Sequence, residues 1–109
     1  MKAGDIVIVN FRGAQGIKRR PAVVVSTDVY HRERPDMILG VISTQVDTAT
    51  SPTDYLLRDW EAAGLVKQSV FRVYRGTYEK KHVSSGVGSL SERDWREVQS
   101  RLRMAVEVN

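Results

Sequence analysis

The chain has 109 residues, no cysteine and a formal net charge of +4. This length supports one core that folds without disulfides, and the absence of cysteine excludes a thiolate metal site. No apolar run approaches the length of a membrane span, so we expect a single cytoplasmic domain over residues 1–109 with no membrane contact.

Turn residues and changes in apolar periodicity divide the chain into short elements. The helix at the end is predicted from apolar residues at three- and four-residue spacing, with Ser91 as its N-cap. In chain order we expect a strand over 5–11, a loop over 12–20, a strand over 21–27, a loop or short helical turn over 28–34, a strand over 37–42, a loop over 46–52, a short strand over 53–58, a helical turn over 59–64, a strand over 69–74, a charged connection over 77–83, an irregular strand over 83–90 and the final helix. Such an order predicts a mainly β fold: a small curled antiparallel sheet or barrel followed by a helix.

The positive charge is concentrated in two segments. Residues 1–34 carry seven Lys or Arg against three acids and residues 65–90 carry five against one, whereas residues 35–64 carry one against five. If the fold brings the two basic segments to one face, they form a surface that attracts phosphate. Generic surface charge is the alternative.

Arg20 and Pro21 form the junction between a basic run and an apolar strand. Proline has a fixed φ and favours an extended conformation at the residue before it. The Arg20 guanidinium is therefore held on a rigid frame, which suits recognition of a phosphate or carboxylate. The alternative is an arginine that only solvates the edge of a strand.

Several kinds of active site are excluded by the residue pattern. His31 and His82 are far apart and there is no cysteine, so we expect no built-in metal and no cofactor. No serine has the surroundings of a nucleophile elbow, and Gly13 and Gly16 are not followed by a phosphate-binding Lys-Ser/Thr pair. What remains is an arginine-rich site, which suits phosphoryl chemistry on RNA with the ribose 2′-hydroxyl as nucleophile.

Five blocks of the sequence carry a family resemblance. They are Gly4-Asp5-Ile6-Val7, Arg20-Pro21-Ala22-Val23-Val24-Val25-Ser26, Ile42-Ser43-Thr44-Gln45, Ser69-Val70-Phe71-Arg72 and Gly88-Ser89-Leu90-Ser91. In this order the chain resembles the MazF/PemK (Kid) family of toxin endoribonucleases. The resemblance implies a curled sheet of the CcdB/MazF (SH3-like) type and a homodimer. It also implies metal-independent, sequence-preferring cleavage of single-stranded RNA to a 2′,3′-cyclic phosphate and a 5′-hydroxyl, and inhibition by a cognate acidic antitoxin.

The resemblance also assigns site residues. Arg20 matches the family arginine before proline, Ser43 matches the hydroxyl residue that closes the third strand, and Arg72 matches an arginine of the PemK branch. We expect these three to be catalytic, with Ser43 donating a hydrogen bond to the phosphate and the arginines stabilising charge. For RNA binding we expect Lys18, Arg19, Gln45, Tyr74 and Arg75.

The chain departs from the family at two acidic positions. The loop before Arg20 lacks the family's glutamate, and Tyr74 stands where the PemK branch has an acid two residues after its arginine. The acceptor of the 2′-hydroxyl proton is therefore open among His31, Tyr74, His82 and solvent.

Two other functions are compatible with the same fold. One is a non-enzymatic toxin that binds DNA gyrase as CcdB does, although that branch ends in aromatic and apolar residues and this chain ends Ala105-Val106-Glu107-Val108-Asn109. The other is a nucleic-acid-binding module without catalytic activity, which the missing carboxylates favour.

Overall fold

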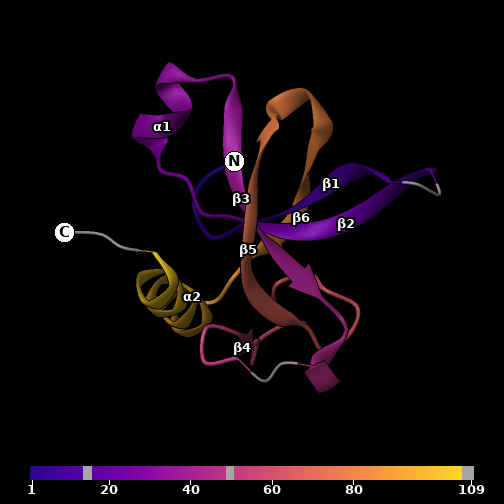
Figure 1. The fold of residues 1–109 in the computed structure, drawn as a ribbon, viewed down its shortest axis with the longest axis vertical. Helices are drawn as coiled ribbons and strands as arrows, with labels where there is room; N and C mark the ends of the chain where they lie inside the picture. The colour runs from indigo at the N-terminus through magenta and orange to yellow at the C-terminus, as the bar shows by residue number, and fades with distance from the viewer. Residues whose placement is uncertain (14–15, 49–50, 107–109) are drawn as a thin grey trace.

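The computed structural model describes the backbone of residues 1–13, 16–48 and 51–106, and within these ranges it does not describe the side chains of 11–13, 48, 74, 75 and 85. The described strands form one antiparallel sheet in the order β4-β5-β3-β2-β1-β6 (Figure 1). The strands are β1 (Asp5–Gly13), β2 (Gly16–Val24), β3 (Asp36–Ser43), β4 (Tyr55–Leu56), β5 (Val70–Glu79) and β6 (Val83–Ser89). The helices are α1 (Asp28–Glu33) and α2 (Glu92–Ala105), with short 3₁₀ turns η1 (Val46–Thr48) and η2 (Lys80–His82).

Each face of the sheet carries its own hydrophobic cluster, because side chains alternate along each strand. The first cluster surrounds the fully buried Phe71 and is covered by α2 through Trp95, Val98 and Leu102. The second cluster lies on the opposite face and consists of Val7, Val9, Ala22, Val24, Met37 and Leu39.

The sheet curls around the second cluster. Tyr78 of β5 and Val83 of β6 both pack against this cluster, although three strands separate β5 from β6 in the sheet order. A flat sheet would not bring those two side chains to the same apolar group. The fold is therefore the expected one, mainly β with a curled antiparallel sheet and a C-terminal helix.

The predicted loop over residues 12–20 is wrong for residues 12–13 and 16–20, while residues 14 and 15 lie outside the described residues. The first strand continues to Gly13, and β2 begins at Gly16, which pairs with Gly13 and has a φ of +108°. Residues 10–12 of β1 supply backbone partners for residues 17–19, so this segment is extended despite its lack of apolar periodicity. Arg20 consequently lies inside a strand, opposite Val9, and not at a strand entrance.

The expected connection over residues 77–83 is also wrong in its first half. Strand β5 runs to Glu79, because residues 76–79 pair with residues 36–39 of β3 and Tyr78 reaches the second cluster. The pairing shifts between Gly40 and Val41, which leaves Val73 and Tyr74 as extra residues in β5. No pattern in the sequence predicts this irregularity.

Most other elements agree with the expectations. The segment 28–34 forms the short helix α1, and the expected strand over 53–58 is reduced to β4. Residues 59–64 form the expected turn, in which the Ala63 N–H donates to the Asp59 carbonyl, closed by Gly64 at a φ of +90°. Ser91 caps α2 by accepting a hydrogen bond from the Asp94 backbone N–H. None of the described helices is long and apolar enough to cross a lipid bilayer.

Candidate active site

Arg20, Ser43 and Arg72 project from the same face of the sheet. Val41 of β3 is paired with Ala22 on one side and with Arg72 on the other, so these three share a face. Arg20 lies two residues before Ala22 in β2, and Ser43 lies two residues after Val41 in β3. Because side chains alternate along a strand, both return to that face. It is the face that carries the second cluster, since Ala22 belongs to it.

The end of β3 joins Ser43 and Arg72 through one backbone segment. The Gln45 N–H donates to Ser43 Oγ at 3.1 Å, and Arg72 Nη2 donates to the Gln45 carbonyl at 3.0 Å. The Val46 N–H returns to the Thr44 carbonyl at 3.0 Å, which fixes the tight turn. Because Ser43 Oγ accepts from the Gln45 N–H, its hydroxyl hydrogen remains available to an incoming acceptor.

The basic run on β2 is exposed along its length. Lys18, Arg19 and Arg20 are all exposed, and Arg20 forms no ion pair with any described residue. Successive side chains of a strand point to opposite faces of the sheet. Lys18 therefore shares the face of Arg20, whereas Arg19 lies on the opposite face. The structure therefore brings Lys18 to the candidate site and separates Arg19 from it.

Of the other expected RNA-binding residues, the structure places the side chain of Gln45 near the candidate site. Gln45 is exposed two residues after Ser43. The side chains of Tyr74 and Arg75 lie outside the described residues, although their backbone belongs to the irregular part of β5.

The two histidines occupy different surroundings. His31 Nε2 is 2.5 Å from Ser26 Oγ, which also accepts from the Ile38 N–H at 3.0 Å. Ile38 is five residues from Ser43 along β3, a distance of about 16 Å at the rise of an extended strand. This geometry disfavours His31 as the proton acceptor. His82 is exposed and immediately precedes Val83, which pairs with Val9 opposite Arg20.

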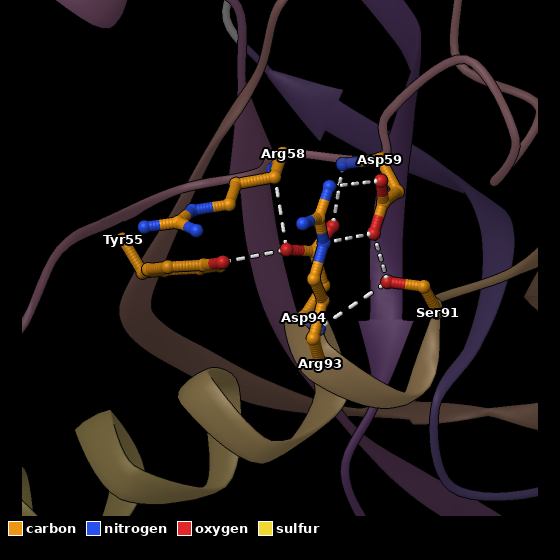
Figure 2. Close-up of polar contacts among 6 residues, drawn as sticks. All are labelled: Tyr55, Arg58, Asp59, Ser91, Arg93 and Asp94. Atoms are coloured by element: carbon orange, nitrogen blue, oxygen red, sulfur yellow. Dashed lines mark hydrogen bonds and ion pairs between the residues drawn. The ribbon is translucent and has the colours of Figure 1, made fainter.

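A second polar cluster lies on the α2 side of the sheet and is the most complete network that the structure describes (Figure 2). The Asp94 carboxylate is fully buried and accepts three hydrogen bonds. The donors are the Tyr55 hydroxyl at 2.5 Å, the Arg58 N–H at 3.1 Å and the Asp59 N–H at 2.8 Å. Burial and the neighbouring carboxylate raise the pKa of Tyr55. With all donors directed at Asp94 from within the protein, this carboxylate holds α2 against β4 and is not placed for substrate.

Asp59 extends the same cluster to the surface. Arg93 contacts both carboxylate oxygens of Asp59, with Nε at 2.7 Å and Nη2 at 2.6 Å, and the Ser91 hydroxyl donates at 2.5 Å. These bonds, from Arg93 first and Ser91 second, lower the pKa of Asp59 to about 2. Sequence reasoning identified Ser91 and Asp94 only as a helix start, because nothing in the spacing links them to residues 55–59.

In the described part of the chain, no group of three or more His, Cys, Asp or Glu side chains is arranged to hold a metal ion. The described site consists of guanidinium, hydroxyl and backbone amide groups. Its chemistry is therefore the binding of anionic groups by charge and by hydrogen-bond donation.

The fold and this site define a class: small curled β proteins with a C-terminal helix and an arginine-hydroxyl cluster at one end of the sheet. A family model described as "PemK-like, MazF-like toxin of type II toxin-antitoxin system" matches residues 2–106. The chain belongs to this family of toxins.

Solved structures show the same fold at low sequence identity. MazF in a MazE-MazF crystal structure from Deinococcus radiodurans is 20% identical with a TM-score of 0.76, over 96% of this chain and 94% of that chain. An endoribonuclease in complex with its cognate antitoxin, from a mycobacterial species, is 16% identical with a TM-score of 0.73, over 96% and 93% of the two chains. The search of curated proteins gave no match.

Proposed function

We propose that this protein is a metal-independent, sequence-preferring endoribonuclease toxin that cleaves single-stranded RNA. The observation that supports it most is the register of the sheet, which gives Arg20, Ser43 and Arg72 a common face in a chain of the PemK/MazF toxin family. The mycobacterial structural neighbour described as an endoribonuclease has the same fold.

The proposed reaction is an internal transphosphorylation. The ribose 2′-oxygen attacks phosphorus, the bond from phosphorus to the 5′-oxygen breaks, and the products are a 2′,3′-cyclic phosphate and a 5′-hydroxyl. The 2′-hydroxyl loses one proton to a base or solvent, and the departing 5′-oxygen gains one. Negative charge gathers on the non-bridging oxygens in the transition state, where fixed donors contribute most.

Each residue has a distinct part in this scheme. Ser43 donates its hydroxyl hydrogen to a non-bridging oxygen, and Arg72, held by the Gln45 carbonyl, supplies positive charge beside it. Arg20 approaches from β2 with its guanidinium exposed. Guanidinium groups stay protonated at neutral pH, so both arginines act by electrostatics and not as general bases.

The test is cleavage of a pool of single-stranded RNA by purified protein in excess EDTA, with the 5′ ends of the products mapped. We expect Arg20→Ala to lower kcat by about 10²–10³. Arg103→Ala removes the same charge from an exposed position on α2 and is expected to cleave like the wild type. The proposal fails if the wild-type protein leaves every RNA in the pool intact.

The proposed partners follow from the family. We propose a homodimer, whose mass in solution is twice the 12.3 kDa of the chain, and a cognate acidic antitoxin that abolishes cleavage when it is added before the RNA. The MazE-MazF neighbour is a complex of a toxin with its antitoxin. A monomer by light scattering, or cleavage unaffected by the antitoxin, contradicts these two proposals.

A further inference from the structure

The strand at one side of the sheet, β4, has an open edge (Figure 1). Tyr55 and Leu56 of β4 pair with β5, and the Leu57 N–H donates to the Ser69 carbonyl at 2.9 Å. Backbone groups of successive residues point to opposite sides of an antiparallel strand. The N–H and carbonyl of Leu56 therefore point away from β5, where the described sheet has no further strand. Such an edge can pair with an added extended chain.

A cavity of about 500 Å³ is lined by the segment 54–58, which contains β4, and by side chains from α2 and from the loop before β5. Its apolar lining includes the buried Tyr55 and Leu57 and the half-buried Trp60. Leu56 also lines the cavity; it is 42% exposed and belongs to neither hydrophobic cluster. Apolar side chains beside an open strand edge form the surface that a peptide covers when it adds to a sheet.

The cavity is lined by one cation and one anion that form no ion pair with a described residue, Arg58 and Asp54. Arg58 is exposed, and its side chain extends beside Tyr55 (Figure 2). Arg101, whose Cζ is 5.3 Å from the centre of the Tyr55 ring, is already bound to Glu97 at 2.7 Å. At the rise of an extended chain, Asp54 and Arg58 lie about 13 Å apart.

This charge pattern favours a peptide over RNA. RNA carries a negative charge at every nucleotide, so it would meet the Asp54 carboxylate as well as Arg58. Residues 35–64 carry one basic residue against five acids, so the surroundings of β4 in the sequence add no attraction for a polyanion. A peptide can place one carboxylate on Arg58, in a charge-assisted hydrogen bond, and a neutral or basic residue toward Asp54.

We propose that an extended segment of the acidic antitoxin adds to the edge of β4. Its main chain pairs with Leu56, an apolar side chain enters the cavity against Leu57 and Trp60, and a nearby carboxylate binds Arg58. A segment that orders only on binding can supply such a strand. This inference rests on the proposed function, which supplies the antitoxin as a partner.

The experiment uses the full chain and a phage-displayed library of peptides of about twelve residues, long enough to form an added strand. Peptides selected on the wild type are synthesised, and their Kd is measured for the wild type, Arg58→Gln, Leu56→Pro and Arg103→Gln. Leu56→Pro removes the outward N–H, at an edge position where a strand tolerates proline. Arg103→Gln removes the same charge as Arg58→Gln from an exposed position on α2. Thermal unfolding verifies that each variant is folded, and Arg58→Gln decides the test alone if Leu56→Pro does not fold.

We expect the selected peptides to carry an acidic residue close to an apolar one. Their binding is expected to weaken at least about tenfold in Arg58→Gln and in Leu56→Pro, and to match the wild type in Arg103→Gln. A library without binders, or binders that are insensitive to Arg58→Gln, overturns the inference.

Three further measurements identify the occupant. A 2′-O-methylated single strand of about fifteen nucleotides is expected to bind Arg58→Gln and Arg103→Gln equally; a larger loss in Arg58→Gln assigns the cavity to RNA and overturns the inference. A lower mass of Leu56→Pro by light scattering assigns the edge to a second copy of this chain and overturns it too.

The third measurement is competition with the antitoxin. Selected peptides in excess are expected to weaken the inhibition of RNA cleavage by the antitoxin, and undiminished inhibition overturns the inference. Cleavage by the wild type without antitoxin is measured in parallel. Failure of the proposed function is therefore recognised separately, as RNA that stays intact in every reaction.

Discussion

At the scale of single residues, the backbone N–H and carbonyl of Gln45 organise the proposed chemistry. Its N–H orients Ser43 Oγ and its carbonyl holds Arg72, so two of the three side chains proposed to act on the phosphate are fixed by one turn. Donors that are already oriented need no reorganisation when charge develops in the transition state. We therefore propose that the hydroxyl of Ser43 donates a hydrogen bond to the phosphate in the transition state.

This arrangement predicts different effects for two substitutions of Ser43. Ser43→Ala removes the donor and is expected to lower kcat by about 10²–10³ with a smaller change in KM. Ser43→Thr keeps a hydroxyl on the same carbon and is expected to recover most of the rate. Single-turnover cleavage with saturating protein measures both. A threonine variant as slow as the alanine variant would show that the hydroxyl has no part in the reaction.

At the scale of elements, Asp94 connects α2 to the edge of the sheet. Its carboxylate accepts from the Tyr55 hydroxyl and from two backbone N–H groups, of Arg58 and Asp59. The helix is thereby held to β4, a strand of two residues that has little pairing of its own.

We expect Asp94→Ala to lower the free energy of unfolding by about 3 kcal/mol or more, because it leaves three donors without an acceptor. Glu92→Ala, two residues earlier on the exposed side of the same helix, is expected to change it by less than about 0.5 kcal/mol. Urea denaturation followed by tryptophan fluorescence compares the two. A similar midpoint for both variants would contradict the assigned role of Asp94.

The elements that the sequence predicted well are those whose signals are local. The final helix has an N-cap and an apolar stripe, and Gly64 closes a turn at a positive φ. The first half of β2 is not predicted from the sequence, because residues 16–20 lack apolar periodicity and are extended only through pairing with β1. The same holds for residues 77–79, whose strand conformation depends on β3.

The residues of the candidate site can be predicted from the sequence, but their arrangement cannot. The residue types at positions 20, 43 and 72 were available from the family resemblance, whereas their shared face depends on the register that joins β2, β3 and β5. The separation of Arg19 from Arg20 follows from the first half of β2, which the sequence predicts to be a loop. The role of the Gln45 backbone had no sequence signal, since any residue supplies the same N–H and carbonyl.

At the scale of the whole molecule, one sheet joins the two hydrophobic clusters, so unfolding of either face exposes the other. Phe71 and Val41 are on neighbouring strands but face opposite clusters, with Gly40 beside them. A Cβ at Gly40 would lie 2.5 Å from Cε1 of Phe71, so the aromatic ring packs directly on the β3 backbone. We therefore expect contacts that anchor α2 to influence the stability of the whole chain.

The Asp59–Arg93 contact makes that stability depend on pH. The pKa of the Asp59 carboxyl in the folded state is about 2, below the usual 3.8, because Arg93 and Ser91 bind the ionised carboxylate. A lowered pKa means that the contact stabilises the fold fully above about pH 4 and is lost as the pH falls through about 2. The free energy of unfolding of the wild type should therefore exceed that of Asp59→Asn at pH 5 by a margin that shrinks steadily toward pH 2. Chemical denaturation of both proteins across this range measures the margin, and 1 M NaCl should reduce it at pH 5, because the Arg93 side chain is 59% exposed. A margin that stays constant with pH would mean that ionised Asp59 contributes nothing to holding α2 on the sheet.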